Sequence, residues 1–196
     1  MTPPRLDSTA DGARRDAATV TPDGRPLHAA LEGVVTVAPV NHVDHRGRVF
    51  EVFAGESDFW VKPVVYCYAF TVRAGQTKGW GLHEHKDDRY TLITGEVLTI
   101  LYDARVESST QGMTQKVVLT GQGVRQLLIP AGVWHCNVNL AETESHMINH
   151  PTETYVHGQP DRLLLPWDTE AIPVDLQSFF PNQFKAPSPG GGPVAG

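Results

Sequence analysis

Short runs of apolar residues, each closed by turn residues, follow one another through the middle of the chain. In the longest run, residues 64–72, large apolar or aromatic side chains stand at every second position, as on one face of a β-strand. No segment shows a convincing helical period over ten or more residues. We expect strands at residues 33–40, 48–53, 64–72, 90–93, 96–102, 115–119, 125–129, 133–138 and 146–149.

Glycine, proline and aspartate separate these runs at short and fairly regular intervals. Many short strands at such spacing are typical of β-sandwiches and small β-barrels. A chain of 196 residues is long enough for one well-buried core. We therefore predict a single all-β domain over residues 31–184.

The two ends of the chain differ from this middle part. Residues 1–30 are rich in Pro, Asp, Thr, Ala and Arg, and residues 185–196 consist mainly of Gly, Pro and Ala. Such segments offer little apolar surface to bury, so they do not compensate the entropy lost on ordering. We expect a flexible N-terminal segment and a disordered C-terminal tail.

Composition and charge narrow the classes of partner. Sixteen basic residues against 22 acidic ones give a net charge of −6, which argues against nucleic acid as a partner. No apolar run approaches the roughly 20 residues that a membrane-spanning helix needs, and the first residues lack the apolar stretch of a signal peptide. We expect a soluble, cytoplasmic protein that acts on a small molecule.

Three of the nine histidines stand in patterns that suggest chemistry. His83 and His85 are two residues apart, so on a strand they would share one face, and Asp88 follows shortly after them. His135 comes just after a Pro-x-Gly turn, at the start of another expected strand. Three imidazoles and one carboxylate that converge from separate strands would suit a divalent transition metal with open coordination positions.

These residues resemble the two motifs of the cupin superfamily. His83, His85, Asp88 and Gly95 match the first motif, although the usual carboxylate is Glu and stands further along the chain. The second motif matches the run from Pro130 through His135 to Asn139. The resemblance implies a double-stranded β-helix, or jelly roll.

A more extensive resemblance, from about residue 40 to 170, points to the dTDP-4-dehydrorhamnose 3,5-epimerase family. It rests on motifs that occur in the family's order: residues 44–53 with Arg46 and Glu51, Gly81-Leu-His83, residues 102–112, residues 128–135, and Thr154-Tyr155. The resemblance implies an isomerase that needs no cofactor and removes a proton next to the keto group of a nucleotide-linked deoxysugar.

The same resemblance implies roles for individual residues. His83 would be the base and Tyr155 the acid, while His135 or Arg89 would donate a hydrogen bond to the enolate. Arg46 and Glu51 match positions that help to hold the nucleotide diphosphate, often across a dimer interface. We therefore expect a homodimer.

Several positions depart from that family. Trp80 stands where the family usually has Arg, so it would stack on the substrate or fill the core, and Ile148 replaces a tyrosine. The late aspartate that orients the base has no clear counterpart. Residues 81–86 instead resemble dTDP-sugar 3,4-ketoisomerases, in which both histidines, here His83 and His85, serve as acid and base without a metal.

Three functions stay open on this basis. The first is an epimerase or ketoisomerase of a dTDP-type keto-deoxysugar. The second is a metal-dependent cupin enzyme with His83, His85, Asp88 and His135 as ligands. The third is a non-catalytic sugar-binding cupin. Apart from Asp88, we expect the charged run 86–89 to be a solvated hairpin.

Overall fold

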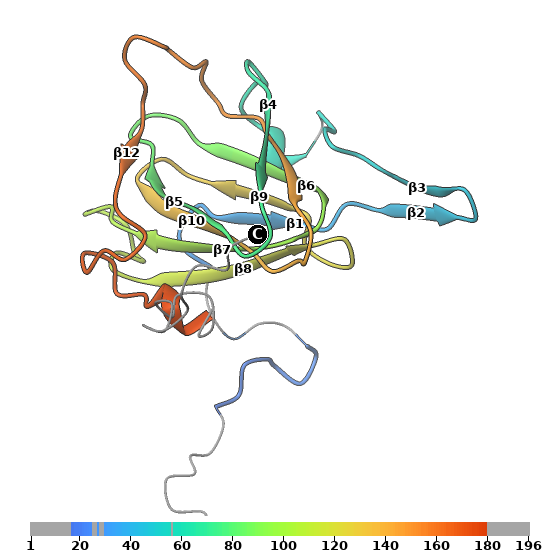
Figure 1. The fold of residues 1–196 in the computed structure, drawn as a ribbon, viewed down its shortest axis with the longest axis horizontal. Helices are drawn as coiled ribbons and strands as arrows, with labels where there is room; N and C mark the ends of the chain where they lie inside the picture. Colours follow the sequence, from blue (N-terminus) through green and yellow to red (C-terminus); the bar gives the residue numbers. More distant parts are fainter. Residues whose placement is uncertain (1–16, 25–26, 28–29, 56, 180–196) are drawn as a thin grey trace, which may run out of the picture.

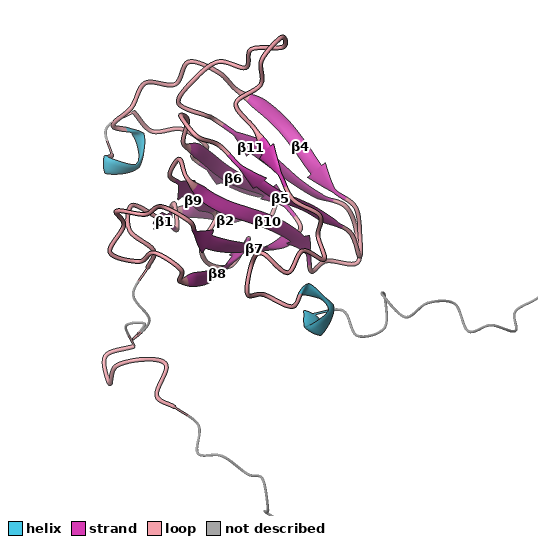
Figure 2. Ribbon diagram, turned by 90° about the vertical axis from the view of Figure 1, so that its left-hand side faces the viewer, coloured by secondary structure: helices cyan, strands magenta, loops and turns pink. Residues whose placement is uncertain are grey.

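Two antiparallel five-stranded sheets face each other and form the body of the protein (Figures 1 and 2). The structure is a computed structural model, and it describes residues 17–24, 27, 30–55 and 57–179. The predicted tail at residues 185–196 and most of the predicted flexible segment at residues 1–30 lie outside the described residues. In the described part of the chain, no helix is long and apolar enough to span a membrane.

The first sheet has the strand order β1-β9-β6-β11-β4 and the second the order β12-β5-β10-β7-β8. The strands of the first sheet are β1 (Val35–Val37), β9 (Gln126–Ile129), β6 (Asp88–Thr94), β11 (Ser145–Asn149) and β4 (Tyr68–Val72). The second contains β12 (Leu163–Leu164), β5 (Thr77–Leu82), β10 (Val133–Asn139), β7 (Glu96–Asp103) and β8 (Thr114–Thr120). Two short 3-10 helices, η2 (Asp58–Trp60) and η3 (Leu176–Phe179), lie outside the sheets. This arrangement is the jelly roll that the cupin resemblance implied.

Most predicted strands are confirmed, and the differences have local causes. The expected strand at residues 64–72 is shorter and begins at Tyr68, whereas β5 was not predicted at all. Strand β5 contains Gly79 and Gly81, which interrupt the apolar alternation. A Cβ on Gly79 would lie 2.6 Å from the carbonyl oxygen of His135, so only glycine allows β10 to approach this closely.

Residues of β7 and β10 alternate between two buried faces. One face of the second sheet packs against the first sheet and forms the core between them, which includes Leu101 and Val133. The other face is covered by the C-terminal segment through Ile172 and Leu176. Burial on both faces explains why these strands read as nearly continuous apolar runs.

Trp80 belongs to this second, outward-facing cluster. Its side chain is fully buried there together with Leu98, Ile100 and Cys136. Because neighbouring residues on a strand point to opposite faces, Trp80 points away from the space between the sheets, which Gly79 and Gly81 border. The prediction that Trp80 contacts substrate is therefore wrong, and the residue fills the core.

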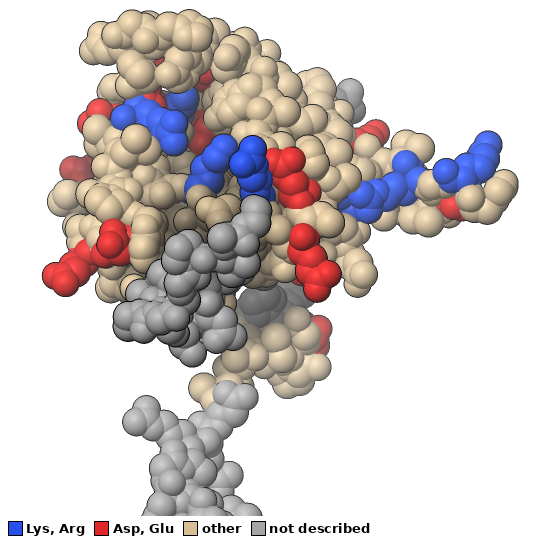
Figure 3. Space-filling model, in the orientation of Figure 1, with Lys and Arg blue, Asp and Glu red and all other residues tan. Residues whose placement is uncertain are grey.

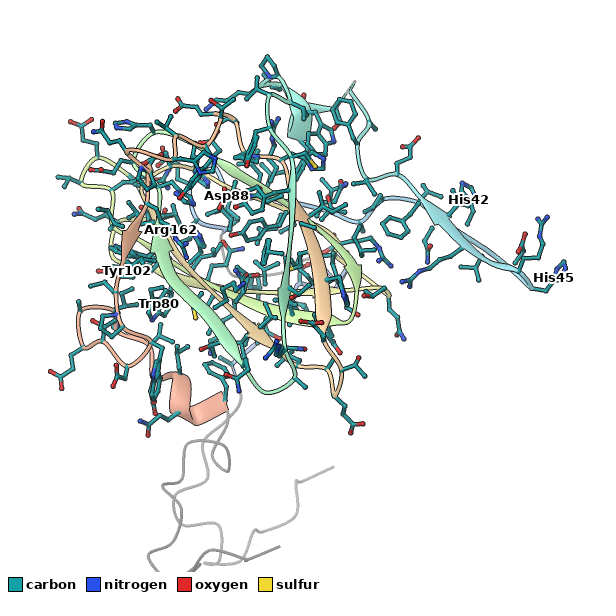
Figure 4. The ribbon with its side chains drawn as sticks, turned by 45° about the horizontal axis from the view of Figure 1, so that its top comes forward. His42, His45, Trp80, Asp88, Tyr102 and Arg162 are labelled. Carbon is teal, nitrogen blue, oxygen red and sulfur yellow. The ribbon has the colours of Figure 1, made fainter. Side chains whose placement is uncertain are left out.

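A hairpin of β2 (Asn41–Asp44) and β3 (Gly47–Phe50) projects from the two sheets (Figure 1). Figure 3 shows basic side chains along it, and Figure 4 shows His42 and His45 far from the body of the protein. Arg46 lies in its turn, where its guanidinium is 2.6 Å from the Asp44 carboxylate and its side chain is 77% exposed. The hairpin therefore carries Arg46 away from the interior of its own chain.

Candidate active site

A cavity of about 480 Å³ opens between the two sheets. Strand β4 and the segment before it contribute aromatic side chains, while β5, β6 and β10 contribute mainly polar ones. Its lining consists of Tyr66, Tyr68, Phe70, Lys78, Gly79, Gly81, His83, Lys86, Asp88, Tyr90, His135, Asn137, Tyr155, His157 and Arg162. A pocket of this size, with an aromatic wall and a polar floor, suits a small molecule such as a sugar.

His83, Asp88 and His135 meet at the floor of this cavity. Nε2 of His83 lies 3.2 Å and Nε2 of His135 lies 3.6 Å from Oδ2 of Asp88. All three side chains are buried, and Figure 4 shows Asp88 within the body of the protein. His83 follows the end of β5, Asp88 begins β6, and His135 lies in β10 opposite Gly81. Gly81 thus leaves room for the imidazole of His135.

Neighbouring side chains hold Asp88 as a carboxylate. Asn149 donates its side-chain N–H to Oδ1 at 2.7 Å, and the Tyr90 hydroxyl donates to Oδ2 at 3.1 Å. Burial raises the pKa of Asp88, but the contacts with His83, His135 and Asn149 outweigh it and leave that pKa below its ordinary value. Asp88 therefore supplies a negative charge between the two imidazoles.

Asp161 fixes the orientation of His83. Nδ1 of His83 donates to the main-chain carbonyl of Asp161, which makes Nε2 the basic nitrogen of the neutral ring. The Asp161 carboxylate accepts the backbone N–H groups of Glu84, His85 and Lys86 at 2.7–3.1 Å. The carbonyl of His83 in turn accepts the backbone N–H of Gly132 at 2.7 Å.

His135 is a neutral imidazole in this setting. Its Nδ1 lies 3.3 Å from the carbonyl of Val133, two residues earlier on β10. Burial lowers the pKa of His135, the Asp88 charge opposes this, and the net shift is downward. Its Nε2 faces Asp88 and the cavity.

Two other predicted residues lie outside the cavity. His85 is exposed and does not line it, because β5 ends at Leu82 and the turn that follows breaks the alternation on which a shared face depends. Arg89 is fully buried on the opposite face of β6 from Asp88, where its guanidinium donates to the carbonyls of Lys62, Pro63 and His150. Arg89 therefore has no access to an enolate in the cavity.

Because His85 lies outside the cavity, three of the four predicted metal ligands come together there. His83, Asp88 and His135 offer ligand atoms that all lie within 4.8 Å of one another, whereas His85 belongs to a separate group with Glu84 and Asp161. Two ligand atoms bound at about 2.1 Å around a tetrahedral ion lie roughly 3.4 Å apart, which is close to the contacts of Asp88 with the two imidazoles. Three of the four predicted ligands thus fit a divalent transition metal.

Tyr155 lines the rim of the cavity. Its side chain is 38% exposed, and its ring lies 4.9 Å from that of His157 and 5.7 Å from Nζ of Lys86. Glu51 and Arg46 do not line the cavity of their own chain.

The structure adds residues that the sequence patterns did not reveal. The run 86–89 is buried rather than solvated, and Lys86 lines the cavity. Arg162, also in the lining, and the neighbouring Asp161 lie in an irregular segment with no periodic pattern (Figure 4). Tyr68 was expected only as a strand residue, although its hydroxyl reaches the Asn149 side chain.

Two facing antiparallel sheets with histidines and a carboxylate at the floor of an interior cavity define a cupin-type jelly roll. A family model described as dTDP-4-dehydrorhamnose 3,5-epimerase matches residues 28–185. The chain belongs to this family. The similarity to 3,4-ketoisomerases at residues 81–86 has no counterpart in this match.

Similar proteins agree with this assignment. The chain is 31% identical over 158 residues to the spore coat polysaccharide biosynthesis protein SpsL of Bacillus subtilis, covering 76% of this chain and 99% of that protein. It is 30% identical over 129 residues to the probable low-salt glycan biosynthesis epimerase Agl13 of Haloferax volcanii, covering 65% and 82%. A dTDP sugar isomerase structure from Desulfovibrio desulfuricans shares the fold with a TM-score of 0.69 and 22% identity, over 76% of this chain and 94% of that one.

The shared carboxylate predicts how the pKa of His135 responds to substitution. Asp88 raises that pKa, so Asp88→Asn should lower it further below the ordinary histidine value. NMR titration of the His135 ring proton measures the change. Asp103→Asn is a matched control, because the Asp103 carboxylate binds Arg105, Ser108 and Thr110 and does not line the cavity. An unchanged or higher His135 pKa in Asp88→Asn would contradict the account.

Proposed function

We propose that this protein is an isomerase of a dTDP-type nucleotide-linked keto-deoxysugar and acts by removing a proton next to the carbonyl. The observation that carries the proposal is His83, whose Nδ1 donates to the Asp161 carbonyl, so that its basic nitrogen is Nε2, 3.2 Å from the buried Asp88 carboxylate. Family membership and the names of similar proteins support the same reaction class. One of them is the 3'-monoepimerase ChmJ of Streptomyces bikiniensis, whose structure contains dTDP-quinovose.

In the first step the C–H bond beside the ketone breaks, and its proton passes to Nε2 of His83. The bonding electrons move into the carbonyl and give an enolate, while the imidazolium is stabilised by Asp88 at 3.2 Å. The enolate needs a nearby donor or cation. His135 was predicted for this task and lines the cavity, as do Lys86 and Arg162, whereas Arg89 does not.

The nucleotide part requires a different set of residues. We propose that Arg46 and Glu51 contact the diphosphate region of a substrate held by a second copy of the chain, because their hairpin projects away from its own cavity. The guanidinium of Arg46 suits bidentate binding to phosphate. Homodimerisation would also cover the exposed apolar residues of the hairpin, among them Val43 and Val49, both at least 70% exposed.

Replacing the base tests the chemistry directly. His83→Asn should lower kcat for a dTDP-4-keto-6-deoxysugar by roughly 100- to 10,000-fold, because the general base is lost. His85→Asn should stay near the wild-type rate, because His85 is exposed and outside the cavity. NMR detection of product isomers measures both. Equal losses in the two variants would contradict the role of His83.

Mixing two inactive variants tests the shared site. If Arg46 serves the partner's cavity, mixed dimers of Arg46→Ala and His83→Asn chains contain one intact site. Statistical mixing should then restore about a quarter of the wild-type activity. If Arg46 serves its own cavity, no mixed dimer has an intact site and the activity is not restored.

A metal-dependent enzyme is the second candidate, favoured only by the convergence of His83, Asp88 and His135. A bound divalent metal would act as a Lewis acid on the substrate carbonyl. The non-catalytic alternative was favoured by the missing aspartate that orients the base. Asp88 and Asp161 both contact the His83 ring, which removes that argument.

Metal removal separates the two enzymatic candidates. We expect dialysis against a chelator to leave the isomerase rate unchanged, because Nε2 of His83 must be free to accept the proton. Elemental analysis of wild type and His135→Ala provides the second readout. About one equivalent of transition metal, lost in the variant together with activity, would establish the metal-dependent alternative.

A further inference from the structure

Tyr68 and His83 occupy corresponding places on opposite walls of the cavity. Strand β4 and strand β5 belong to different sheets and are joined by the short turn at residues 73–76. Tyr68 begins β4 and His83 follows the end of β5, so both lie at the end remote from that turn (Figure 1). Both side chains line the cavity. A sugar between these walls would present one face to each residue.

The Tyr68 hydroxyl is oriented by Asn149. Strand β11 pairs with β4 so that Asn149 stands opposite Tyr68, and its side-chain N–H donates to the Tyr68 oxygen at 2.9 Å. The same amide group donates to Oδ1 of Asp88 at 2.7 Å. Because Asn149 supplies the donor, the phenolic O–H of Tyr68 is left to point elsewhere, and the cavity is the open direction.

We propose that Tyr68 is the catalytic acid of this enzyme and delivers a proton to the enolate on the face opposite His83. This inference rests on the proposed function. Burial raises the pKa of the Tyr68 hydroxyl to about 12, so the group holds its proton at neutral pH until the enolate carbon takes it. The N–H of Asn149 then stabilises the phenolate that forms.

The proton balance of this step is complete. The Tyr68 O–H bond breaks, a C–H bond forms on the enolate carbon, and the electron pair of the enolate restores the C=O bond. Tyr68 is left as phenolate and His83 as imidazolium. The proton on His83 returns to Tyr68 through water in the open cavity before the next turnover, so no other reactant is needed.

Tyr155, the acid implied by the family resemblance, is less suitably placed than Tyr68 for proton delivery. It lies at the rim with 38% of its side chain exposed, and its contacts are with the His157 ring and the Lys86 ammonium. The family tyrosine missing at Ile148 falls beside Asn149, whose strand partner is Tyr68. The tyrosine on β4 therefore takes up the role from the neighbouring strand.

Separating proton removal from proton delivery tests the proposal. Tyr68→Phe, Tyr155→Phe and the matched control Tyr102→Phe are incubated with a dTDP-4-keto-6-deoxysugar in heavy water. Tyr102 packs against the outward-facing cluster of the second sheet and does not line the cavity. Deuterium in the recovered substrate measures proton removal by His83. Formation of the inverted product measures proton delivery by the acid. Thermal unfolding confirms that each variant is folded.

We expect Tyr68→Phe to keep deuterium exchange but to lose inverted product by at least about 100-fold. Tyr102→Phe should form product at nearly the wild-type rate, and Tyr155→Phe should lose far less product than Tyr68→Phe. Loss of product in Tyr155→Phe with normal product in Tyr68→Phe would overturn the proposal, as would loss of exchange in Tyr68→Phe. Absence of both exchange and product in the wild type would instead refute the proposed function itself.

Discussion

The negative charge of Asp88, buried between two sheets, is the constraint on which the site depends. A buried carboxylate is costly unless charges and hydrogen bonds compensate it, and here two imidazoles, Asn149 and Tyr90 do so. These partners come from β6, β10, β11 and the end of β5, so the cluster connects the two facing sheets. The same carboxylate lies 3.2 Å from Nε2 of His83, the proposed base, which links the packing of the two sheets to the chemistry.

The fold places the proton-transfer residues and the residues proposed for nucleotide binding in different parts of the molecule. Residues for proton transfer lie inside the cavity between the two sheets. Arg46, proposed for the nucleotide, lies in the turn of a hairpin outside it, and Glu51 directly follows that hairpin. Arg162 and Lys86 line the cavity of their own chain, and Arg46 is proposed to come from the partner. Enolate chemistry and nucleotide recognition can therefore vary separately within one jelly roll.

Much of this could be predicted from the sequence, because strand alternation and motif spacing are local properties. The all-β domain and the presence of His83, Asp88 and His135 in one site followed from them, and the jelly roll was implied by the cupin resemblance. Whether Trp80 and Arg89 face the core or the cavity depends on the limits of β5 and β6. The glycines of β5 concealed that strand in the sequence pattern, and β6 begins two residues earlier than expected. Asp161 and Arg162 reach the site only through tertiary folding of an irregular segment, which leaves no pattern in the sequence.

The most direct test of the central claim is the number of deuterons that the wild-type enzyme places next to the ketone of a dTDP-4-keto-6-deoxysugar in heavy water. Mass spectrometry of the sugar reports it without assuming which isomer forms. The account predicts at least one carbon-bound deuteron, because the proton that His83 removes is replaced by one that comes from solvent. A product that forms without any deuterium would contradict base catalysis at the Asp88 cluster.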